Sequence, residues 1–574
     1  MYLIFDTETT GLPKRWDAPI SDVDNWPRVV QIAWQLHDAM GNLVAHRHEL
    51  IRPEGFDIPF ESEQIHGIST ALAKEKGIPV KTVLEDFRDV LSKAKFIVGQ
   101  NIGFDKNVVG AEFYRLGMTD ALEGLPVLDT CTETTAELCR LPGGKGGKFK
   151  LPTLTELYNH LFDDGFEEAH NASADVEATA RCFFELLRTG QGFTREESER
   201  IALIISPDYF VRFAGMHPQP VQPAGLKHIN LKAESEKLRK VQSAETISEA
   251  EIHENRKQLG EAVFAHLHNH SQFSILQATS GIKELVKATA RAKMPAVALT
   301  DTANMMGAFH FVKEINAHNK TAETRNKEAL AKGELPEAVS IKPIIGCEFY
   351  VCENRKDRSR RDNGYRIVML AKNKNGYRNL SKMASIAYIE GFYYVPRIDR
   401  EIVARYSEDI IVLTGNLYGE VPAKILTLGE RQAEEALLWW KGIFGDDLYI
   451  EIMRHGQADE DRVNETLLRF AGKHQVKVVA TNNTFYINKE DANAHDILLC
   501  VKDGEKQSTP IGQGRGFRYG LPNQEYYFKS SEAMKELFKE FPEAIMNIRE
   551  IIDKISYYDL AHDVLLPRFD IPEA

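Results

Sequence analysis

The chain has 574 residues and a mass of 64.9 kDa, which is too long for one hydrophobic core and predicts about two to four domains. Its net charge of −13 opposes a protein that coats duplex DNA by neutralising phosphates, so any nucleic-acid contact is expected at a local site. No stretch approaches the ~18 to 20 apolar residues of a membrane span, and the N-terminus has no signal or transit pattern, so we expect a cytoplasmic protein with no membrane partner.

The first part of the chain has the pattern of an α/β domain. Strand-like runs cover residues 2–5, 29–38 and 42–51, and helical periodicity covers residues 81–94 and 172–188. The six cysteines form no CxxC pair and lie far apart, which predicts reduced thiols rather than a disulfide framework or a zinc ribbon.

Two carboxylates stand at the end of the first predicted strand. Asp6 and Glu8 are two residues apart, so on a strand of period two they project from the same face and can share a cation. Hard oxygen ligands of this kind suit Mg²⁺ or Mn²⁺. A DxE pair alone is weak evidence, because most such pairs are solvated strand ends.

Two further motifs follow in order. FIVGQNIGFDKNVV places Asn101 and then Asp105 after an apolar strand, and HNASADVEATARCFF places His170 five residues before Asp175 at the start of a helix. With DTETTG, these motifs make the sequence resemble the DnaQ-like DEDDh 3′→5′ exonucleases, which include the epsilon proofreading subunit of bacterial DNA polymerase III. The resemblance covers residues 1–188 and implies an RNase H-like fold.

The resemblance also implies a role for each site residue. Two Mg²⁺ or Mn²⁺ ions are held by the four acids, which are Asp6, Glu8, Asp105 and Asp175. His170 is the candidate general base, because histidine exchanges protons near neutral pH.

The substrate implied is the 3′ end of DNA, single-stranded or mismatched. Substrate contacts are predicted for Thr7, for Asn101 and for His66 in QIHGIS, although for the last two a plain structural hydrogen bond is an equal alternative. An exonuclease that trims RNA stays an alternative, since RNase T and oligoribonuclease share these acids and the histidine.

The apolar density falls after the first domain and rises again in a second α/β region. Residues 191–262 are rich in Lys and Glu, which predicts a charged, partly helical linker with exposed helices and no core. Beyond it, strand-like runs alternate with helical stretches, a pattern typical of βα units wound into a sheet or barrel. These runs cover residues 296–301, 342–351, 365–371, 409–415, 447–452 and 477–482.

The second region opens with HLHNHS, which places His268 and His270 on one face of a strand. It resembles the PHP domain at the front of the bacterial DNA polymerase III alpha subunit through LTDTANMMGAF, KPIIGCEFYV, LAKNKNGYRNLSKMAS and ATNNTFYINKEDANAHDILLC. The resemblance implies four segments: an exonuclease domain at 1–190, the linker, a PHP (β/α) barrel at 263–550, and at 551–574 the start of a connection to a polymerase palm. It also implies replisome partners such as the sliding clamp.

The PHP metal site is degenerate in this sequence. Four ligands of the active family members are retained, namely His268, His270, Asp301 and Glu348. Others are replaced, by Thr302, Arg366, Asn416, Asn483 and Phe485. The guanidinium of Arg366 adds a positive charge that opposes a cation. We therefore expect no metal cofactor in this domain, with an active PHP phosphoesterase as the alternative.

Overall fold

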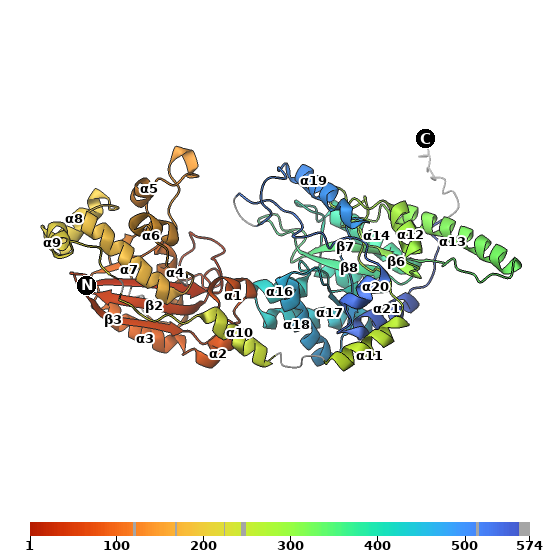
Figure 1. Ribbon diagram of the computed structural model, residues 1–574, viewed down its shortest axis with the longest axis horizontal. Helices are drawn as coiled ribbons and strands as arrows, with labels where there is room; N and C mark the ends of the chain where they lie inside the picture. Colours follow the sequence, from red (N-terminus) through yellow and green to blue (C-terminus); the bar gives the residue numbers. More distant parts are fainter. Residues whose placement is uncertain (119–121, 167–168, 223, 243–247, 513–515, 562–574) are drawn as a thin grey trace, which may run out of the picture. The chain divides into compact units, whose positions relative to one another are not determined.

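The computed structural model describes residues 1–118, 122–166, 169–222, 224–242, 248–512 and 516–561. The chain folds as two compact units (Figure 1), one formed by Met1–Glu245 and Thr427–Gly429 and the other by Thr246–Leu426 and Glu430–Ala574. Both units are α/β, as the sequence predicts. The predicted connection at 551–574 lies in large part outside the described residues.

The first unit is built on a mixed five-stranded sheet in the order β3-β2-β1-β4-β5. Its strands are β1 (Tyr2–Thr9), β2 (Val29–His37), β3 (Leu43–Leu50), β4 (Phe96–Gly99) and β5 (Val127–Asp129). The central strand β1 runs antiparallel to β2 and parallel to β4. The predicted strands are confirmed, whereas β5, with three residues, is too short to give a periodic signal and was not predicted.

Helices cover both faces of this sheet (Figure 1). They are α1 (Phe60–His66), α2 (Thr70–Lys76), α3 (Val80–Leu91), α4 (Gly103–Arg115), α5 (Glu133–Cys139), α6 (Leu154–Phe162), α7 (Ala172–Thr189), α8 (Arg195–Ile204), α9 (Tyr209–Met216) and α10 (Leu231–Gln242). Leu3 and Phe5 of β1 pack with α3 and α4, while Tyr2 and Ile4 pack with α7. Since side chains alternate along a strand, the even-numbered residues of β1 face α7.

The segment 191–262 does not lack a core. Ile201, Tyr209 and Phe213, on α8 and α9, are buried in the cluster that holds α7 against β1. The expectation of exposed helices without a core is therefore wrong for this part of the segment, because a few large side chains suffice for burial where the average apolar density is low.

The second unit contains a curved, mixed seven-stranded sheet in the order β12-β11-β10-β8-β7-β6, with β9 paired to β7. Its strands are β6 (Ala296–Leu299), β7 (Lys342–Cys352), β8 (Tyr365–Ala371), β9 (Arg397–Asp399), β10 (Ile410–Leu413), β11 (Leu448–Ile452) and β12 (Lys477–Ala480). All six predicted runs are strands, and β9 was not predicted.

The segment 266–270 joins the two ends of this sheet. His266 O accepts from Ala298 N at 2.9 Å at the β6 edge, while His270 N donates to Thr484 O at 2.9 Å just beyond β12. The main chain that carries the HLHNHS motif therefore lies between the first and last strands of the sheet, which curls it toward a barrel.

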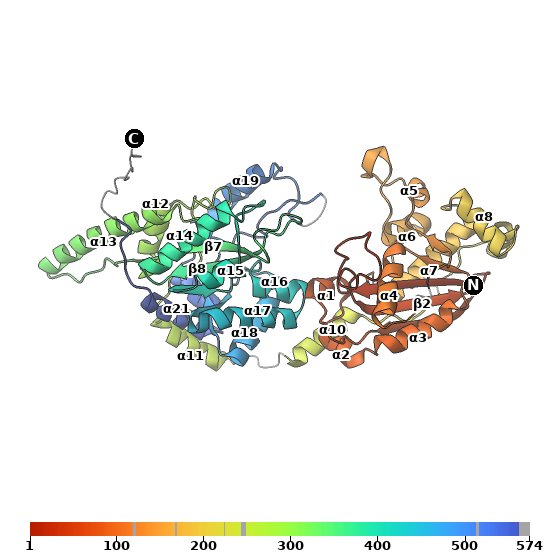
Figure 2. The same ribbon diagram turned by 180° about the vertical axis from the view of Figure 1, so that it is seen from behind.

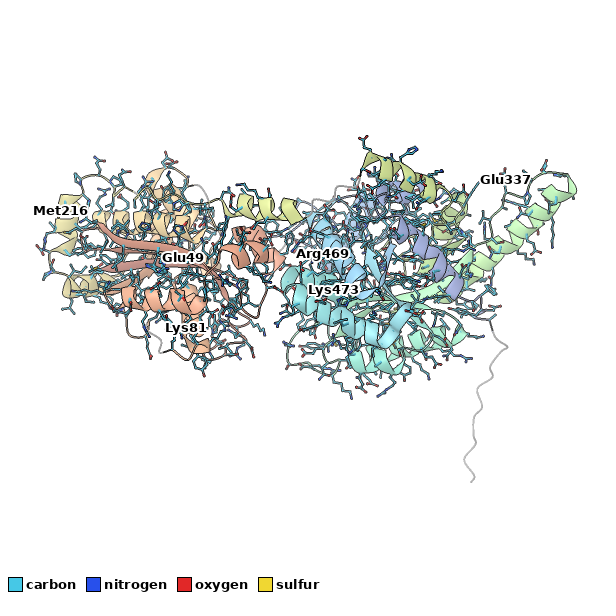
Figure 3. The ribbon with its side chains drawn as sticks, turned by 90° about the horizontal axis from the view of Figure 1, so that it is seen from below. Glu49, Lys81, Met216, Glu337, Arg469 and Lys473 are labelled. Carbon is cyan, nitrogen blue, oxygen red and sulfur yellow. The ribbon has the colours of Figure 1, made fainter. Side chains whose placement is uncertain are left out.

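Helices surround the sheet of the second unit, and Figure 2 shows α14 lying against β7 and β8. They are α11 (Glu249–Gly260), α12 (Ile282–Arg291), α13 (Ala308–Ala331), α14 (Lys374–Ile389), α15 (Arg400–Arg405), α16 (Glu420–Thr427), α17 (Glu430–Phe444), α18 (Ala458–His474), α19 (Ala492–Asp503), α20 (Ser531–Leu537) and α21 (Pro542–Lys554). Arg469 and Lys473 of α18 (Figure 3) form ion pairs with Glu430 and Glu434 of α17.

The structure also bears on the cysteines and on membrane-spanning helices. All six cysteines are free thiols, as predicted. Among the described residues, no helix combines the length and the apolar character that a membrane crossing requires.

Candidate functional site

Three carboxylates of the first unit come together on the α7 face of the sheet. Asp6 and Glu8 extend from the even side of β1, and Asp175 extends from the first turn of α7. Each offers an oxygen, and these oxygens all lie within 4.8 Å of one another. The group is typical of an oxygen-ligand site for a hard divalent cation.

The start of α7 fixes the position of Asp175. Asn171 is the N-cap, and its side-chain oxygen accepts from Ser173 N at 3.2 Å. Gln31 on β2 donates to the same oxygen at 3.2 Å and accepts from Ala172 N at 3.1 Å. Since Gln31 pairs with Glu8 in the sheet register, the helix start is tied directly beside the carboxylates of β1.

The fourth acid, Asp105, reaches the site from α4 through Thr7. Asp105 is buried, and its Oδ1 accepts from Thr7 N at 2.9 Å and from Thr7 Oγ1 at 2.6 Å. Asp105 also raises the pKa of each of the other three acids by charge repulsion. The structure thus brings all four predicted acids into one electrostatically connected group.

The charged form of these carboxylates is disfavoured when no cation is bound. Burial, followed by repulsion from the other acids, raises the pKa of Asp6 and of Glu8 well above the usual value. Burial likewise raises the pKa of Asp105 and of Asp175, in each case to about 7. Since a buried anion needs a compensating charge, the donor set fits a divalent cation.

His170 stands next to these acids but projects into solvent. Its main chain is in the left-handed region, with φ of 67°, and its amide donates to Asp175 Oδ2 at 3.1 Å. The side chain is exposed. The described geometry therefore attaches the His170 backbone to a candidate metal ligand and leaves the imidazole open to a substrate or to water.

The three predicted substrate contacts have structural partners of their own. Thr7 is bonded to Asp105, as described above. Asn101 has a φ of 56°, and its main-chain N–H donates to Asp129 Oδ1 at 2.8 Å. His66 is buried at the end of α1, its Nδ1 accepts from Ile68 N at 3.0 Å, and burial lowers its pKa to about 4. His66 is thus neutral near pH 7.

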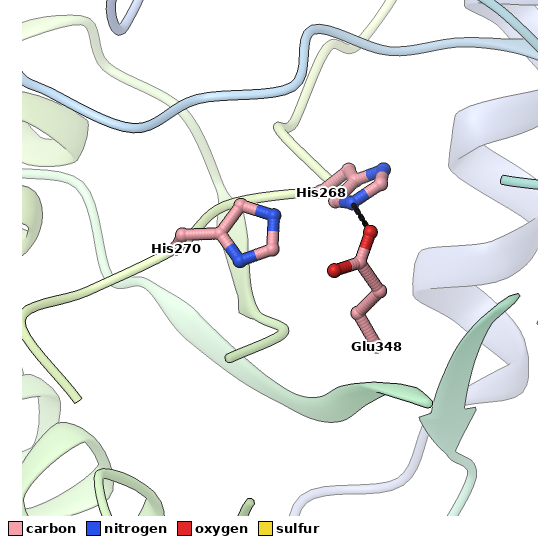
Figure 4. A group of neighbouring side chains, drawn as sticks. All are labelled: His268, His270 and Glu348. Carbon is pink, nitrogen blue, oxygen red and sulfur yellow. Dashed lines mark ion pairs between the residues drawn. The ribbon is translucent and has the colours of Figure 1, made fainter. Parts of the chain in front are cut away.

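A second cluster lies in the sheet of the other unit. Nitrogens of His268 and His270 and an oxygen of Glu348 lie within 4.8 Å of one another, and all three residues are fully buried (Figure 4). His268 Nε2 is 3.5 Å from Glu348, and its Nδ1 is 2.9 Å from Glu451. Asp301 accepts hydrogen bonds from Ser271 and Ser274 instead.

The residues that replace PHP ligands surround this cluster. Thr302 Oγ1 donates to Glu348 at 3.1 Å, and Asn416 Nδ2 donates to it at 3.4 Å. A guanidinium nitrogen of Arg366 is 3.9 Å from the same carboxylate. Two more replacements contact His270: Nε2 of that histidine lies 3.0 Å from Asn483 Oδ1, and Phe485 stacks on its ring at 4.6 Å.

The charges in this second cluster compensate one another. Burial disfavours a charged imidazole, but the carboxylates of Glu451 and Glu348 overcome it and raise the pKa of His268 to about 9. Burial also opposes the charge on Glu348, yet Arg366 holds the pKa of that carboxyl below its usual value. An imidazole that is protonated between two carboxylates has no lone pair for a metal.

Two features of the sites were missed from the sequence. Glu451 is buried within the run LYIEI. A charged residue inside an apolar strand is visible in the sequence, so this residue could have been predicted. His228, by contrast, lies in residues 191–262, which are predicted to be a linker, and it contacts Ser173 and Glu177 of α7. No local pattern predicts that contact.

Family models match the two units separately. Residues 3–183 match the family described as Exonuclease, and residues 266–455 match the family described as PHP domain. The chain therefore carries an exonuclease domain, a hydrolase domain that acts on nucleic acid, followed by a PHP domain.

Relatives are found among DNA polymerase III alpha subunits. The chain is 37% identical over 314 residues to those of Borreliella burgdorferi and Treponema pallidum, and 37% identical over 330 residues to that of Thermus aquaticus. Each match covers 54% of this chain but only 25%, 24% and 24% of the relative, respectively. About half of the chain is thus homologous to these subunits, and the chain spans about a quarter of their length.

Solved structures of exonuclease I are weakly similar. That of E. coli exonuclease I with a dT13 oligonucleotide has 22% identity and a TM-score of 0.27, and covers 33% of this chain and 41% of its own. The zinc-bound E. coli enzyme with single-stranded DNA has 23% identity and a TM-score of 0.28, covering 35% and 42%.

Proposed function

We propose that the first unit is a 3′→5′ exodeoxyribonuclease that removes mismatched 3′-terminal nucleotides from DNA in the bacterial cytoplasm. The observation that carries the proposal is the group of four carboxylates. Asp6, Glu8 and Asp175 each place an oxygen within 4.8 Å of the other two, and the charge of Asp105 raises the pKa of all three. Half-buried acids of like charge beside a buried one, Asp105, are costly to keep together unless a bound cation compensates them.

In this proposal the four acids hold two Mg²⁺ or Mn²⁺ ions, which stabilise charge on the attacking and leaving oxygens of phosphodiester hydrolysis when bound. His170 accepts the proton of the attacking water, whose oxygen forms a bond to phosphorus. The bond from phosphorus to the 3′ oxygen of the remaining chain breaks, and that oxygen takes a proton from solvent to give a free 3′ hydroxyl. The imidazole of His170 is exposed and its main-chain amide is bonded to Asp175, so the ring is accessible for this transfer. The products are a nucleoside 5′-monophosphate and a chain one nucleotide shorter.

The other residues of the site support binding and orientation. Thr7 holds Asp105 through two hydrogen bonds to one oxygen. His66, at the end of α1, and Asn101, just after β4, are proposed to contact the 3′-terminal nucleotide, and Thr7 to add a contact from β1. Neutral His66 suits hydrogen bonding rather than proton transfer, because its pKa lies at about 4.

The homology to DNA polymerase III alpha subunits supports a replicative context. We propose that the chain is the N-terminal part of such a subunit with a proofreading nuclease fused in front, and that the polymerase palm follows the PHP domain. Replisome components such as the sliding clamp are the proposed partners. The PHP domain then serves as a scaffold rather than as a second catalyst.

The test is degradation of 5′-labelled oligonucleotides by the full chain in Mg²⁺. We expect single-nucleotide shortening from the 3′ end of DNA, and no shortening by an Asp6→Ala, Glu8→Ala double variant, because the variant lacks two ligands. RNA of the same sequence should be cut more slowly. Near-normal activity of the double variant would falsify the assignment, and a strong preference for RNA would favour the RNA-trimming alternative.

One observation favours a second function, a metal-dependent phosphoesterase in the PHP domain. His268, His270 and Glu348 are close enough to ligate one ion. Two others oppose it: Arg366 already neutralises Glu348, and Glu451 engages Nδ1 of His268. We therefore propose that this cluster is a metal-free ion-pair network.

A further inference from the structure

The segment that follows α9 returns to the nuclease site. We call residues 225–238 the strap. His228 Nε2 lies 2.9 Å from Glu177 Oε2, and His228 Nδ1 lies 2.9 Å from Ser173 Oγ. The other oxygen of Glu177 accepts from Gly225 N at 2.7 Å. Both sides of the Glu177 carboxylate therefore hold the strap.

These contacts brace the helix turn that presents Asp175. Ser173 and Glu177 are one turn apart and share a face of α7, while Asp175 between them projects from a different face, toward β1. Ile229 O accepts from Asn171 Nδ2 at 3.0 Å, so the strap also binds the N-cap residue. The strap thus packs against the first turn of α7 on the face opposite to the one from which Asp175 extends.

The other end of the strap is hydrogen-bonded to the turn that follows His66. Ser235 Oγ donates to Gly67 O at 2.6 Å and accepts from Ser69 N at 3.0 Å. Gly67 has φ of 76°, and a Cβ there would come within 2.6 Å of Lys232 N, so the two main chains touch. Leu231 is buried with Ile58, Ile68 and Leu72. Figure 1 shows α10 beside α2, in agreement with this packing.

We propose that the strap is part of the exonuclease site, and that His228 is a positioning residue that holds Asp175 in its ligating place. The side chains of His228 and Glu177 are 19% and 10% exposed, so their contact is largely shielded from water, which strengthens it. His228 acts on Asp175 through Ser173 and Glu177, the residues two positions to either side of it on α7, and groups outside the ligand shell set the orientation of a ligand. The inference rests on the metal site of the proposed function.

The experiment measures Mn²⁺ binding to the full chain without nucleic acid, by electron paramagnetic resonance. The portion of the signal lost in the Asp6→Ala, Glu8→Ala variant reports the nuclease site. His228→Ala should weaken that portion by about 10-fold, the scale typical of residues behind metal ligands. His228→Gln, which keeps a donor and an acceptor, should recover part of it. His253→Ala, at an exposed histidine of α11, is the matched control and should bind like the unmodified chain.

The outcomes are distinct. Unchanged Mn²⁺ affinity in His228→Ala overturns the proposal, including the case in which only the melting temperature falls, because that case shows a merely structural role. If His228→Ala does not fold, Glu177→Gln decides in the same assay, and unchanged affinity there also overturns the strap. If Mn²⁺ binding depends on His228 but the chain degrades no DNA, the strap stands and the proposed function fails.

Discussion

Thr7 Oγ1 donates to Asp105 Oδ1 at 2.6 Å, and the amide of the same threonine donates to the same oxygen at 2.9 Å. The residue between the two β1 acids therefore orients the acid that comes from α4. Thr7 faces the opposite side of the strand from Asp6 and Glu8, which is why it meets α4 rather than α7.

Replacing Thr7 with Val should lower exonuclease activity by about 10-fold, because the hydroxyl that orients a ligand is lost while the shape is kept. The Mg²⁺ concentration for half-maximal activity should rise in parallel. Thr189→Val is the matched control, since Thr189 lies at the far end of α7 and bonds only its own helix. Equal metal dependence in the two variants would contradict the role assigned to Thr7.

The metal-free first unit should lose stability as pH rises. Asp105 and Asp175 have a pKa of about 7 in the folded chain, against ~3.9 for aspartate in an unfolded chain. The folded state therefore binds more protons, and the free energy of unfolding should fall between about pH 4 and pH 7 and stay low above it.

This dependence is measured by hydrogen exchange in EDTA, as the free energy of opening of the amides in β1 and α7 at each pH. Excess Mg²⁺ should remove the fall, because the cation compensates the charges that protons compensate at low pH. Asp105→Asn should make the fall shallower, whereas Asp17→Asn, at a side chain that is 85% exposed, should not. A metal-free chain that is more stable at pH 8 than at pH 5 would show that the carboxylates are not crowded.

Local patterns were enough to predict which faces and turns of single elements carry three of the acids. Period-two alternation put Asp6 and Glu8 on one face of β1, and helical periodicity after residue 171 put Asp175 in the first turn of α7. These two elements carry three of the four acids, whereas the metal-binding role of all four was implied by the resemblance.

Contacts between distant segments could not be predicted in this way. Thr7 and Asp105 are 98 residues apart, and His228 and Glu177 are 51 apart. The strap mixes apolar and charged residues, and much of its binding uses main-chain groups, as at Gly67 and Ile229. Composition therefore placed it in a linker, whereas hydrogen bonds attach it to the site.

Primers with a mismatched 3′ end should be shortened faster than matched primers. A single-strand site must receive an unpaired end, and unpairing costs about a few kcal/mol in a duplex and less at a mismatch. The measurement compares initial rates on two primers that differ only in the template base opposite the 3′ end, with the free single strand as a reference. Equal rates on both duplexes would contradict a proofreading role.

The last prediction concerns the PHP domain, which should hold no stoichiometric zinc, iron or manganese. Against the effect of burial, the carboxylates of Glu451 and Glu348 raise the pKa of His268 to about 9, which favours its protonated form over a metal-bound one. The guanidinium of Arg366 cannot lose its charge to admit a cation.

Mass-spectrometric metal analysis of the full chain tests this, in an Asp6→Ala, Glu8→Ala background that empties the nuclease site. Arg366→His removes the opposing charge and adds a ligand beside Glu348, so this variant should take up more metal than its parent. Metal that is stoichiometric in the parent and lost on His268→Ala, His270→Ala would establish a working PHP metal site. That result would make phosphoester hydrolysis by the second unit the better reading, because three buried ligands would then outweigh the charge of Arg366.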